Sequence, residues 1–209
     1  TLPIESCDDL ALEEQIKVLL EFLEERRSSR QRLSAISFNK PFETLREGQA
    51  EGQIGLEQSF GIAPITLFEA PTGFGKTGTA LSFALERLRS GFCDRILYLT
   101  GKTTGQNEVV RTLDAMIPDD CGFRYICLRN RTERNIGFED LEHLSEQELA
   151  RRWRSAALNP LALFRGGTIP EKNLIESAKH AGIPPYEIIR ACLPFAELWL
   201  GDFNYVFQP

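Results

Sequence analysis

Two glycines, a lysine and a threonine fall within five consecutive positions, Gly73 to Thr77. Glycine permits a tight turn in which backbone N–H groups surround a phosphate, and the positive end of a following helix attracts the anion. A lysine here can reach the β- and γ-phosphates of a nucleotide, and the neighbouring hydroxyl can ligate magnesium. The pattern therefore predicts a phosphate-binding loop with Lys76 and Thr77 as catalytic residues and Thr77 as the Mg²⁺ ligand. The nucleotide-contacting residues that we expect in it are Pro71, Thr72, Gly73, Phe74, Gly75, Lys76, Thr77 and Gly78.

The loop departs from the strict pattern at Ala70, where glycine is the general choice. A plain strand–turn–helix connection is the alternative interpretation. A second "GKT" begins at Gly101 and also follows an apolar segment. No glycine turn precedes its lysine, so we do not interpret it as a second nucleotide site.

The segments around the loop predict how it is positioned. Ile65–Glu69 and Arg95–Thr100 have the character of strands, and the stretch between them has apolar residues at helical spacing that end at Gly91. Strand, helix and strand in about 35 residues form a βαβ unit, which predicts a parallel sheet and an α/β fold. We expect a third strand at Phe123–Leu128 and a return to the sheet at Glu197–Phe203.

Helices are predicted over most of the remaining chain. Leu10–Arg27 is amphipathic, Leu45–Phe60 and Gln106–Met116 are further helical candidates, and "RRSSRQR" between the first two suggests a hinge or a solvated helix end. Residues 129–183 contain no convincing strand. Within them, "SEQE" and "TIPE" are typical of capping-box helix starts, the second with Pro170 at the first helical position and Gly182 at the end.

Composition narrows the class of protein. The 209-residue chain is 42% hydrophobic and 26% charged, which is usual for a globular protein with one sizeable core. A net charge of −6 argues against binding nucleic acid over the whole surface and leaves room for a local basic groove. No apolar run approaches the roughly 20 residues of a membrane span, so we expect no membrane partner. Five irregularly spaced cysteines do not suggest a disulfide framework, which favours a reducing, cytoplasmic location.

Four stretches together resemble a known family. "EAPTGFGKT" resembles motif I of superfamily 2 helicases, which tolerate alanine at its first glycine position. "LREGQ", "YLTGKTTGQ" and "PPYEIIRACLPFAELWLGDFNYVFQP" resemble, in the family's order, the "R-x-G-Q" element, motif Ia and the "C-P-Y-E" to "N-Y-L-F-D-P" region of XPD/DinG-like DNA helicases. Gly101 departs from the usual threonine of motif Ia. The resemblance implies a RecA-like P-loop NTPase fold, a parallel sheet flanked by helices, with a mostly helical insertion.

The resemblance also implies an ATP-driven DNA translocase, acting in repair or replication on single-stranded or forked DNA. By this analogy Gln49 contacts adenine, since a side-chain amide suits its paired donor and acceptor, and Arg46 helps to position the base or the loop. Phosphate contacts position a strand without reading its sequence. The implied DNA-facing residues are Lys102, Thr103, Gln106, Asn204 and Tyr205. For each of these five, a satisfied turn or surface polar group is the alternative.

Two catalytic parts of the family are missing from this sequence. No acidic motif II follows a strand, and "FEDLEHL" within the insertion is interpreted as a solvated helix start. The second motor domain with its arginine finger is also absent. We therefore expect a fragment of the first motor domain that needs the rest of the chain as partner. Because these parts supply most of the catalysis in phosphoryl transfer, we expect negligible ATP hydrolysis from the 209 residues alone.

Many family members hold a [4Fe–4S] cluster on four cysteines of the insertion. Here Pro184 stands where the last of these cysteines is expected, and residues 128–191 contain no cysteine. ATP and Mg²⁺ are therefore the expected cofactors, and a cluster is not expected. Cys121, Cys127 and Cys192 are interpreted as core residues.

The predicted organisation has four parts: an N-terminal helical extension or linker at 1–40, motor domain at 41–128, the helical insertion at 129–183 and motor domain again at 184–209. The extension could serve oligomerisation or join an upstream nuclease domain. Two other functions remain open, an RNA-acting motor and a P-loop ATPase switch or adaptor. Competition between matched DNA and RNA strands separates the first from a DNA helicase. Strand-stimulated turnover excludes the second.

Overall fold

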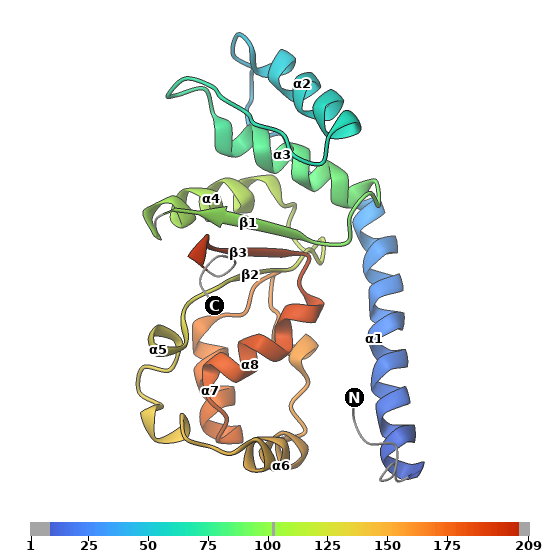
Figure 1. Cartoon of the computed structure of the whole chain (residues 1–209), viewed down its shortest axis with the longest axis vertical. Coiled ribbons are helices and arrows are strands. Elements are labelled where there is room, and N and C mark those ends of the chain that lie inside the picture. Colours follow the sequence, from blue (N-terminus) through green and yellow to red (C-terminus); the bar gives the residue numbers. More distant parts are fainter. Residues whose placement is uncertain (1–8, 102, 205–209) are drawn as a thin grey trace.

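The computed structural model describes residues 9–101 and 103–204, and they form an α/β unit. Its centre is a three-stranded parallel sheet with helices on both sides (Figure 1). Strand β1 is Ile96–Thr100, β2 is Tyr125–Cys127 and β3 is Leu198–Asp202. Their order is β1-β3-β2, and both outer strands pair in parallel with β3, so that Ile96 and Tyr125 each lie opposite Leu198. The predicted α/β class and parallel sheet are confirmed, and three of the four predicted strands lie within a residue or two of these bounds.

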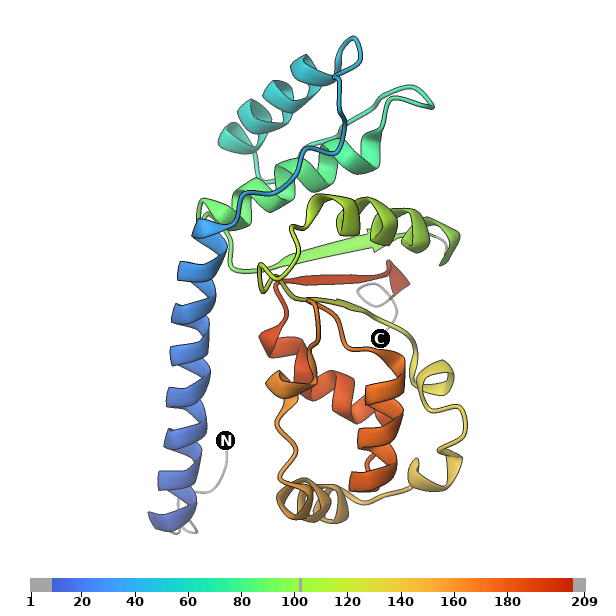
Figure 2. The same cartoon turned by 180° about the vertical axis from the view of Figure 1, so that it is seen from behind.

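One face of the sheet is covered by α4, Thr103–Met116, with α3, Lys76–Arg89, packed on top of it. Helix α2, Gln49–Ile62, lies outermost, and the C-terminal part of α1, Asp9–Ala35, reaches the edge of this layer (Figure 2). A continuous hydrophobic core joins these elements to the sheet. It contains Leu33, Ile36, Leu81, Leu85, Leu88, Val109, Leu113, Met116, Phe123, Tyr125, Leu198 and Leu200.

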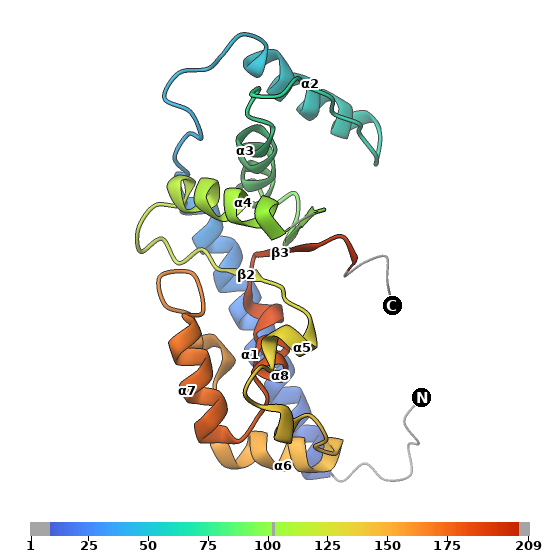
Figure 3. The same cartoon turned by 90° about the vertical axis from the view of Figure 1, so that its left-hand side faces the viewer.

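The opposite face carries the helical insertion and the helix that follows it (Figure 3). The elements are α5 (Arg131–Arg134), α6 (Glu146–Ala156), α7 (Glu171–Ala181) and α8 (Pro185–Cys192), with short 3₁₀ turns η2 (Glu139–Leu141), η3 (Pro160–Leu163) and η4 (Leu193–Phe195). They form a second core that reaches the sheet through Ile126 and Trp199. Side chains alternate across a strand, so Leu198 and Leu200 face the first core while Trp199 faces the second.

The predicted strand at Ile65–Glu69 is wrong, and so is the βαβ unit predicted to join it through α3 to β1; the parallel sheet is built from β1, β2 and β3 instead. These residues are extended, but their backbone makes no hydrogen bond to another backbone group in the described part of the chain. The segment instead follows α2, where Phe68 lies close to Gly52, while the side chains of Ile65 and Leu67 are 79% and 95% exposed. A strand forms only beside a hydrogen-bonded neighbour. Residues 65–69 make no backbone hydrogen bond to the outer edge of β1 or of β2, which are the edge strands of the described sheet.

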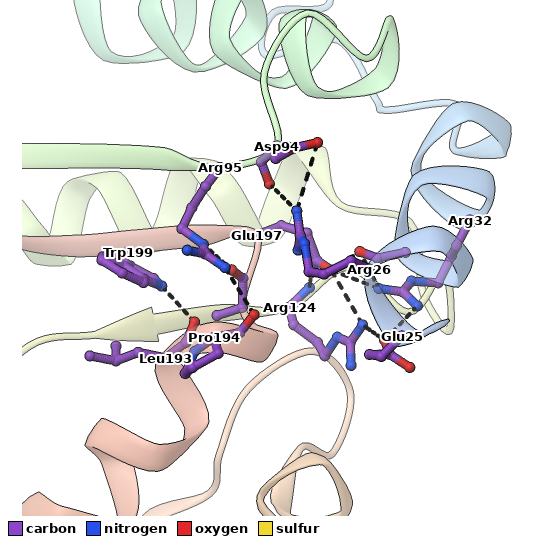
Figure 4. A network of polar contacts seen from close by, with 12 residues as sticks. Glu25, Arg26, Arg32, Asp94, Arg95, Arg124, Leu193, Pro194, Glu197 and Trp199 are labelled. Carbon is purple, nitrogen blue, oxygen red and sulfur yellow. Dashed lines mark hydrogen bonds and ion pairs between the residues drawn. The ribbon is translucent and has the colours of Figure 1, made fainter. Parts of the chain in front are cut away.

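The hinge predicted at "RRSSRQR" is also wrong, because α1 continues without a break to Ala35. Figure 4 shows why: this part of α1 is joined to the sheet by polar contacts. The fully buried Glu197 accepts hydrogen bonds from Ser29 Oγ at 2.5 Å and from Arg32 at 2.6 Å. Its second oxygen accepts the backbone N–H of Arg124 at 2.7 Å. We call Ser29, Arg32, Arg124 and Glu197 the Glu197 cluster.

The predicted amphipathic half of α1 has its apolar residues on one face, but that face is solvent-exposed. The exposed fractions of these side chains lie between 43% and 55%. They are Leu12, Ile16, Leu19, Leu20 and Leu23. No helix among the described residues is both long and apolar enough to cross a membrane.

The ends of α6, α7 and α2 differ in how closely they follow the sequence patterns. The Ser145–Glu148 capping box is present, with both reciprocal hydrogen bonds. The one expected at "TIPE" is not, because Pro170 is the N-cap residue itself and no side chain caps α7. Gly182 ends α7 in the left-handed conformation, as predicted. Helix α2 begins four residues later than expected, at Gln49, because residues 45–48 form the turn that contacts the glycine loop.

Candidate nucleotide-binding site

The glycine loop connects the extended segment 65–70 to α3. Gly73 and Gly75 have φ angles of 82° and 89°, which only glycine adopts without strain. Gly75 is the N-cap of α3, and no side chain caps this helix. The first backbone N–H groups of α3 are therefore available to an anion at the positive end of the helix.

Lys76 folds back over the loop. Its Nζ donates to the carbonyl oxygen of Ala70 at 2.7 Å and to that of Pro71 at 3.0 Å. The ammonium group is thus held at the loop by two neutral acceptors, and the side chain remains exposed. A phosphate would offer this cation a charged acceptor, and such hydrogen bonds are roughly twice as strong as neutral ones.

The "LREGQ" stretch holds the loop from outside. The Arg46 guanidinium donates to the carbonyl of Gly73, and the Gln49 side-chain amide donates to the carbonyl of Phe74. Gln49 is fully buried, and its Oε1 accepts the backbone N–H of Arg46 at 2.8 Å. Two stretches separated by more than 20 residues in the sequence therefore meet in one hydrogen-bonded unit. Contact of Gln49 with adenine stays a prediction; in this conformation its amide is used to fix the loop.

Phe42 is a part of the site that the sequence did not reveal. A Cβ atom built on Gly75 would lie 2.6 Å from Phe42 Cζ, and one built on Gly78 would lie 2.7 Å from the same atom. The aromatic ring therefore packs directly against the loop and the first turn of α3, which explains the need for glycine at both positions. The only signal was an aromatic residue shortly ahead of "LREGQ", and that is common in any globular protein.

Thr77 faces β1. Its side chain lies near the hydroxyl of Tyr98; burial raises the pKa of Tyr98, and the neighbouring Thr77 hydroxyl partly lowers it again. Tyr98 also packs against the first core. The hydroxyl that we predicted as the Mg²⁺ ligand thus lies beside the middle of β1.

The residues predicted to face nucleic acid come from two strand ends. Gln106 lies in α4, which begins at Thr103, and Asn204 follows β3, where its backbone N–H donates to Asp202 Oδ1 at 2.9 Å. Thr100 pairs with Asp202, and the N–H of Phe203 donates to the carbonyl of Thr100 at 3.2 Å. The two stretches are therefore brought together at the carboxyl edge of the sheet. Lys102 and Tyr205 lie outside the described residues.

The glycine loop lies at this same end of the molecule. In Figure 1, α3 and α4 both begin on the side where β1 and β3 end. Parallel α/β sheets bind ligands at the carboxyl ends of their strands. Those predicted nucleotide and nucleic-acid residues that the structure describes thus belong to segments at one end of the sheet.

The described residues contain no group of three or more histidine, cysteine, aspartate or glutamate side chains placed to hold a metal ion. Cys93, Cys121, Cys127 and Cys192 are free thiols. Cys192 is buried in α8, where burial raises its pKa to about 12. The role of Thr77 as a Mg²⁺ ligand stays a prediction.

No protein-family model matches the chain, and no curated protein matches it.

Proposed function

We propose that this chain is the nucleotide-binding part of an ATP-dependent DNA helicase or translocase with a RecA-like P-loop fold. The observation that carries the proposal is the joint architecture of the glycine loop and the "LREGQ" stretch. Arg46 and Gln49 bind successive loop residues, and Phe42 fills the space that a side chain at Gly75 would need. A plain strand–turn–helix connection requires neither contact.

The residues present fit a nucleoside triphosphate with Mg²⁺. Gly73 and Gly75 allow the backbone to curl, the start of α3 supplies uncapped N–H donors, and Lys76 supplies a positive charge. The carbonyl oxygens of Gly73 and Phe74 accept hydrogen bonds from Arg46 and Gln49. These donors offset the partial negative charge of the two oxygens, which would otherwise repel a bound phosphate. Mg²⁺ held by the Thr77 hydroxyl would neutralise charge on the phosphates.

The test is binding of a non-hydrolysable ATP analogue with Mg²⁺, measured by calorimetry on the 209-residue chain. Lys76→Ala removes a charged donor, and we expect a loss of about 1.5–3 kcal/mol, roughly 10- to 150-fold in affinity. Lys172→Ala is the matched control, because Lys172 lies in α7 with its side chain 84% exposed. Equal affinity of wild type and Lys76→Ala would refute the nucleotide site.

The nucleic-acid half of the proposal is tested separately. We expect a labelled single-stranded DNA to bind with steep salt dependence, because contacts would go to phosphates. Gln106→Ala is expected to weaken binding, while a matched RNA strand measures the preference for DNA. If RNA competes better than DNA of the same sequence, the motor acts on RNA. If neither strand binds, a P-loop ATPase switch or adaptor replaces the helicase proposal.

A further inference from the structure

A groove runs between α1 and the segments that follow α6 and α8, on the side of the sheet away from the glycine loop. It encloses about 1060 Å³. Figure 2 shows α1 lying alongside this helical layer. We call it the α1 groove. Its lining residues are Leu19, Glu21, Phe22, Glu24, Glu25, Ser28, Leu158, Asn159, Pro160, Leu161, Pro194 and Phe195.

The two walls of the α1 groove differ in chemistry. The wall opposite α1 is mainly apolar, formed by two leucines, two prolines and Phe195. Phe22 of α1 meets Phe195 edge to face, with ring centroids 6.3 Å apart, and this contact joins the walls. The remaining α1 wall is acidic, with Glu21, Glu24 and Glu25 on adjacent turns.

The acidic charge of the α1 groove is largely uncompensated. Glu25 pairs with Arg124 at 2.5 Å. Glu21 and Glu24 are exposed, and they form no ion pair with any residue that the structure describes. No lysine, arginine or histidine appears among the described lining residues. The groove therefore combines an apolar surface with free negative charge.

We propose that the α1 groove binds a basic amphipathic peptide segment of a partner protein. Its apolar side chains would pack against Leu158, Leu161 and Phe195, and its lysines or arginines would face Glu21 and Glu24. The α1 wall extends from Leu19 to Ser28, roughly 13 Å at 1.5 Å per residue. Two to three turns of a helix match this length, and an amphipathic helix in an apolar groove is a common mode of peptide recognition.

The charge of the groove selects against other occupants. Nucleic acid and anionic membrane surfaces carry negative charge and would be repelled by Glu21 and Glu24. A second copy docked through its own α1 wall would bring like charges together, which costs binding energy. The proposal does not depend on nucleotide binding, because the groove lies on the other side of the sheet from α3.

The experiment uses a fluorescent 14-residue helical peptide with leucines on one face and lysines on the other. Binding to the full 209-residue chain is followed by fluorescence anisotropy. We expect saturable binding that Glu21→Lys with Glu24→Lys weakens by at least about tenfold, since each side loses its complementary charge. Leu161→Asp is expected to weaken it similarly by disrupting the apolar wall. A peptide with glutamates in place of the lysines should not bind.

The matched control is Glu51→Lys with Glu57→Lys, which makes the same change in net charge on exposed positions of α2. Its peptide affinity should stay within about twofold of wild type, a difference of less than 0.5 kcal/mol. Circular dichroism verifies that each variant is folded, and the surface pair at 21 and 24 is expected to fold normally. The proposal is overturned by absence of wild-type binding, by equal weakening in the control, or by an Ile16→Asp variant that abolishes binding while Leu161→Asp does not. Peptide-independent dimerisation through the groove in light scattering would also overturn it.

Discussion

Replacing Glu197 by glutamine tests whether the Glu197 cluster fixes α1 to the sheet. The carboxylate is fully buried and accepts four hydrogen bonds, two of them from Arg124 at 2.7 and 3.3 Å. Glutamine preserves the shape, but it removes the charge and turns one acceptor into a donor that faces other donors. Removing one partner of a buried ion pair typically costs 3–5 kcal/mol. We expect about 3 kcal/mol here, because the Arg32 side chain is 25% exposed and can be partly hydrated.

For a chain of this size, 1 kcal/mol corresponds to roughly 2–4 °C in Tm, so the expected drop is about 6–12 °C. Thermal and urea unfolding, followed by circular dichroism, measure it. Asp94→Asn is the control, because the Arg30–Asp94 pair joins the same helix to the same region with side chains that are 65% and 49% exposed. Exposed ion pairs contribute little. If Glu197→Gln lowers Tm no more than Asp94→Asn does, the cluster is not what holds α1.

Three further outcomes are expected. Gly75→Ala should destabilise the chain by at least about 1 kcal/mol more than Gly73→Ala, because both positions need a positive φ but only an alanine at 75 collides with Phe42. In thermal unfolding, adding Phe42→Ala should restore part of this difference. Equal losses of stability in Gly75→Ala and Gly73→Ala would contradict the packing of Phe42 on Gly75. Iodoacetamide at pH 8 should leave Cys192 unmodified in the native chain and label it in urea, as read by mass spectrometry. Burial raises the pKa of the Cys192 thiol from 9.0 to about 12, so the stability that comes from keeping this thiol protonated should be lost as pH rises from about 9. Fast labelling of Cys192 in the native chain would contradict its burial. The 209 residues with single-stranded DNA should release negligible phosphate from ATP, whereas robust release would reveal an acidic motif elsewhere in the chain.

The fold was predictable where a local pattern coincided with its tertiary surroundings. β1, β3, α3 and α4 carry apolar periodicity, and the structure buries those apolar faces. Ile65–Glu69 has an equally good strand pattern, yet pairing is decided by neighbours and not by the segment itself. The charged "RRSSRQR" stretch suggests a hinge or a solvated helix end, and much of it is exposed, but its local pattern does not reveal the buried carboxylate, 165 residues away from Arg32, that makes it part of a helix–sheet junction.

The residues of the candidate site could be proposed from the sequence, but the contacts that hold the glycine loop in place could not. The glycines and Lys76 have a recognisable spacing, and their left-handed φ angles follow from it. The role of Phe42 depends on a distance between ring and glycine that no spacing encodes. Likewise, the family resemblance predicted Arg46 and Gln49 for the candidate site without showing that their donors reach two loop carbonyls.

The strand order has a consequence for how the chain folds as it leaves the ribosome. β1 and β2 pair only with β3 among the described strands, and β3 starts at Leu198, almost 100 residues after β1 ends at Thr100. Translation proceeds at about 5–20 residues per second, so β1 waits on the order of 5–20 s for its neighbour. Ser29 likewise waits for Glu197, which follows it by 168 residues. During this interval the nascent chain has two unpaired strands, whose backbone edges and apolar side chains stay open to wrong contacts until β3 is made.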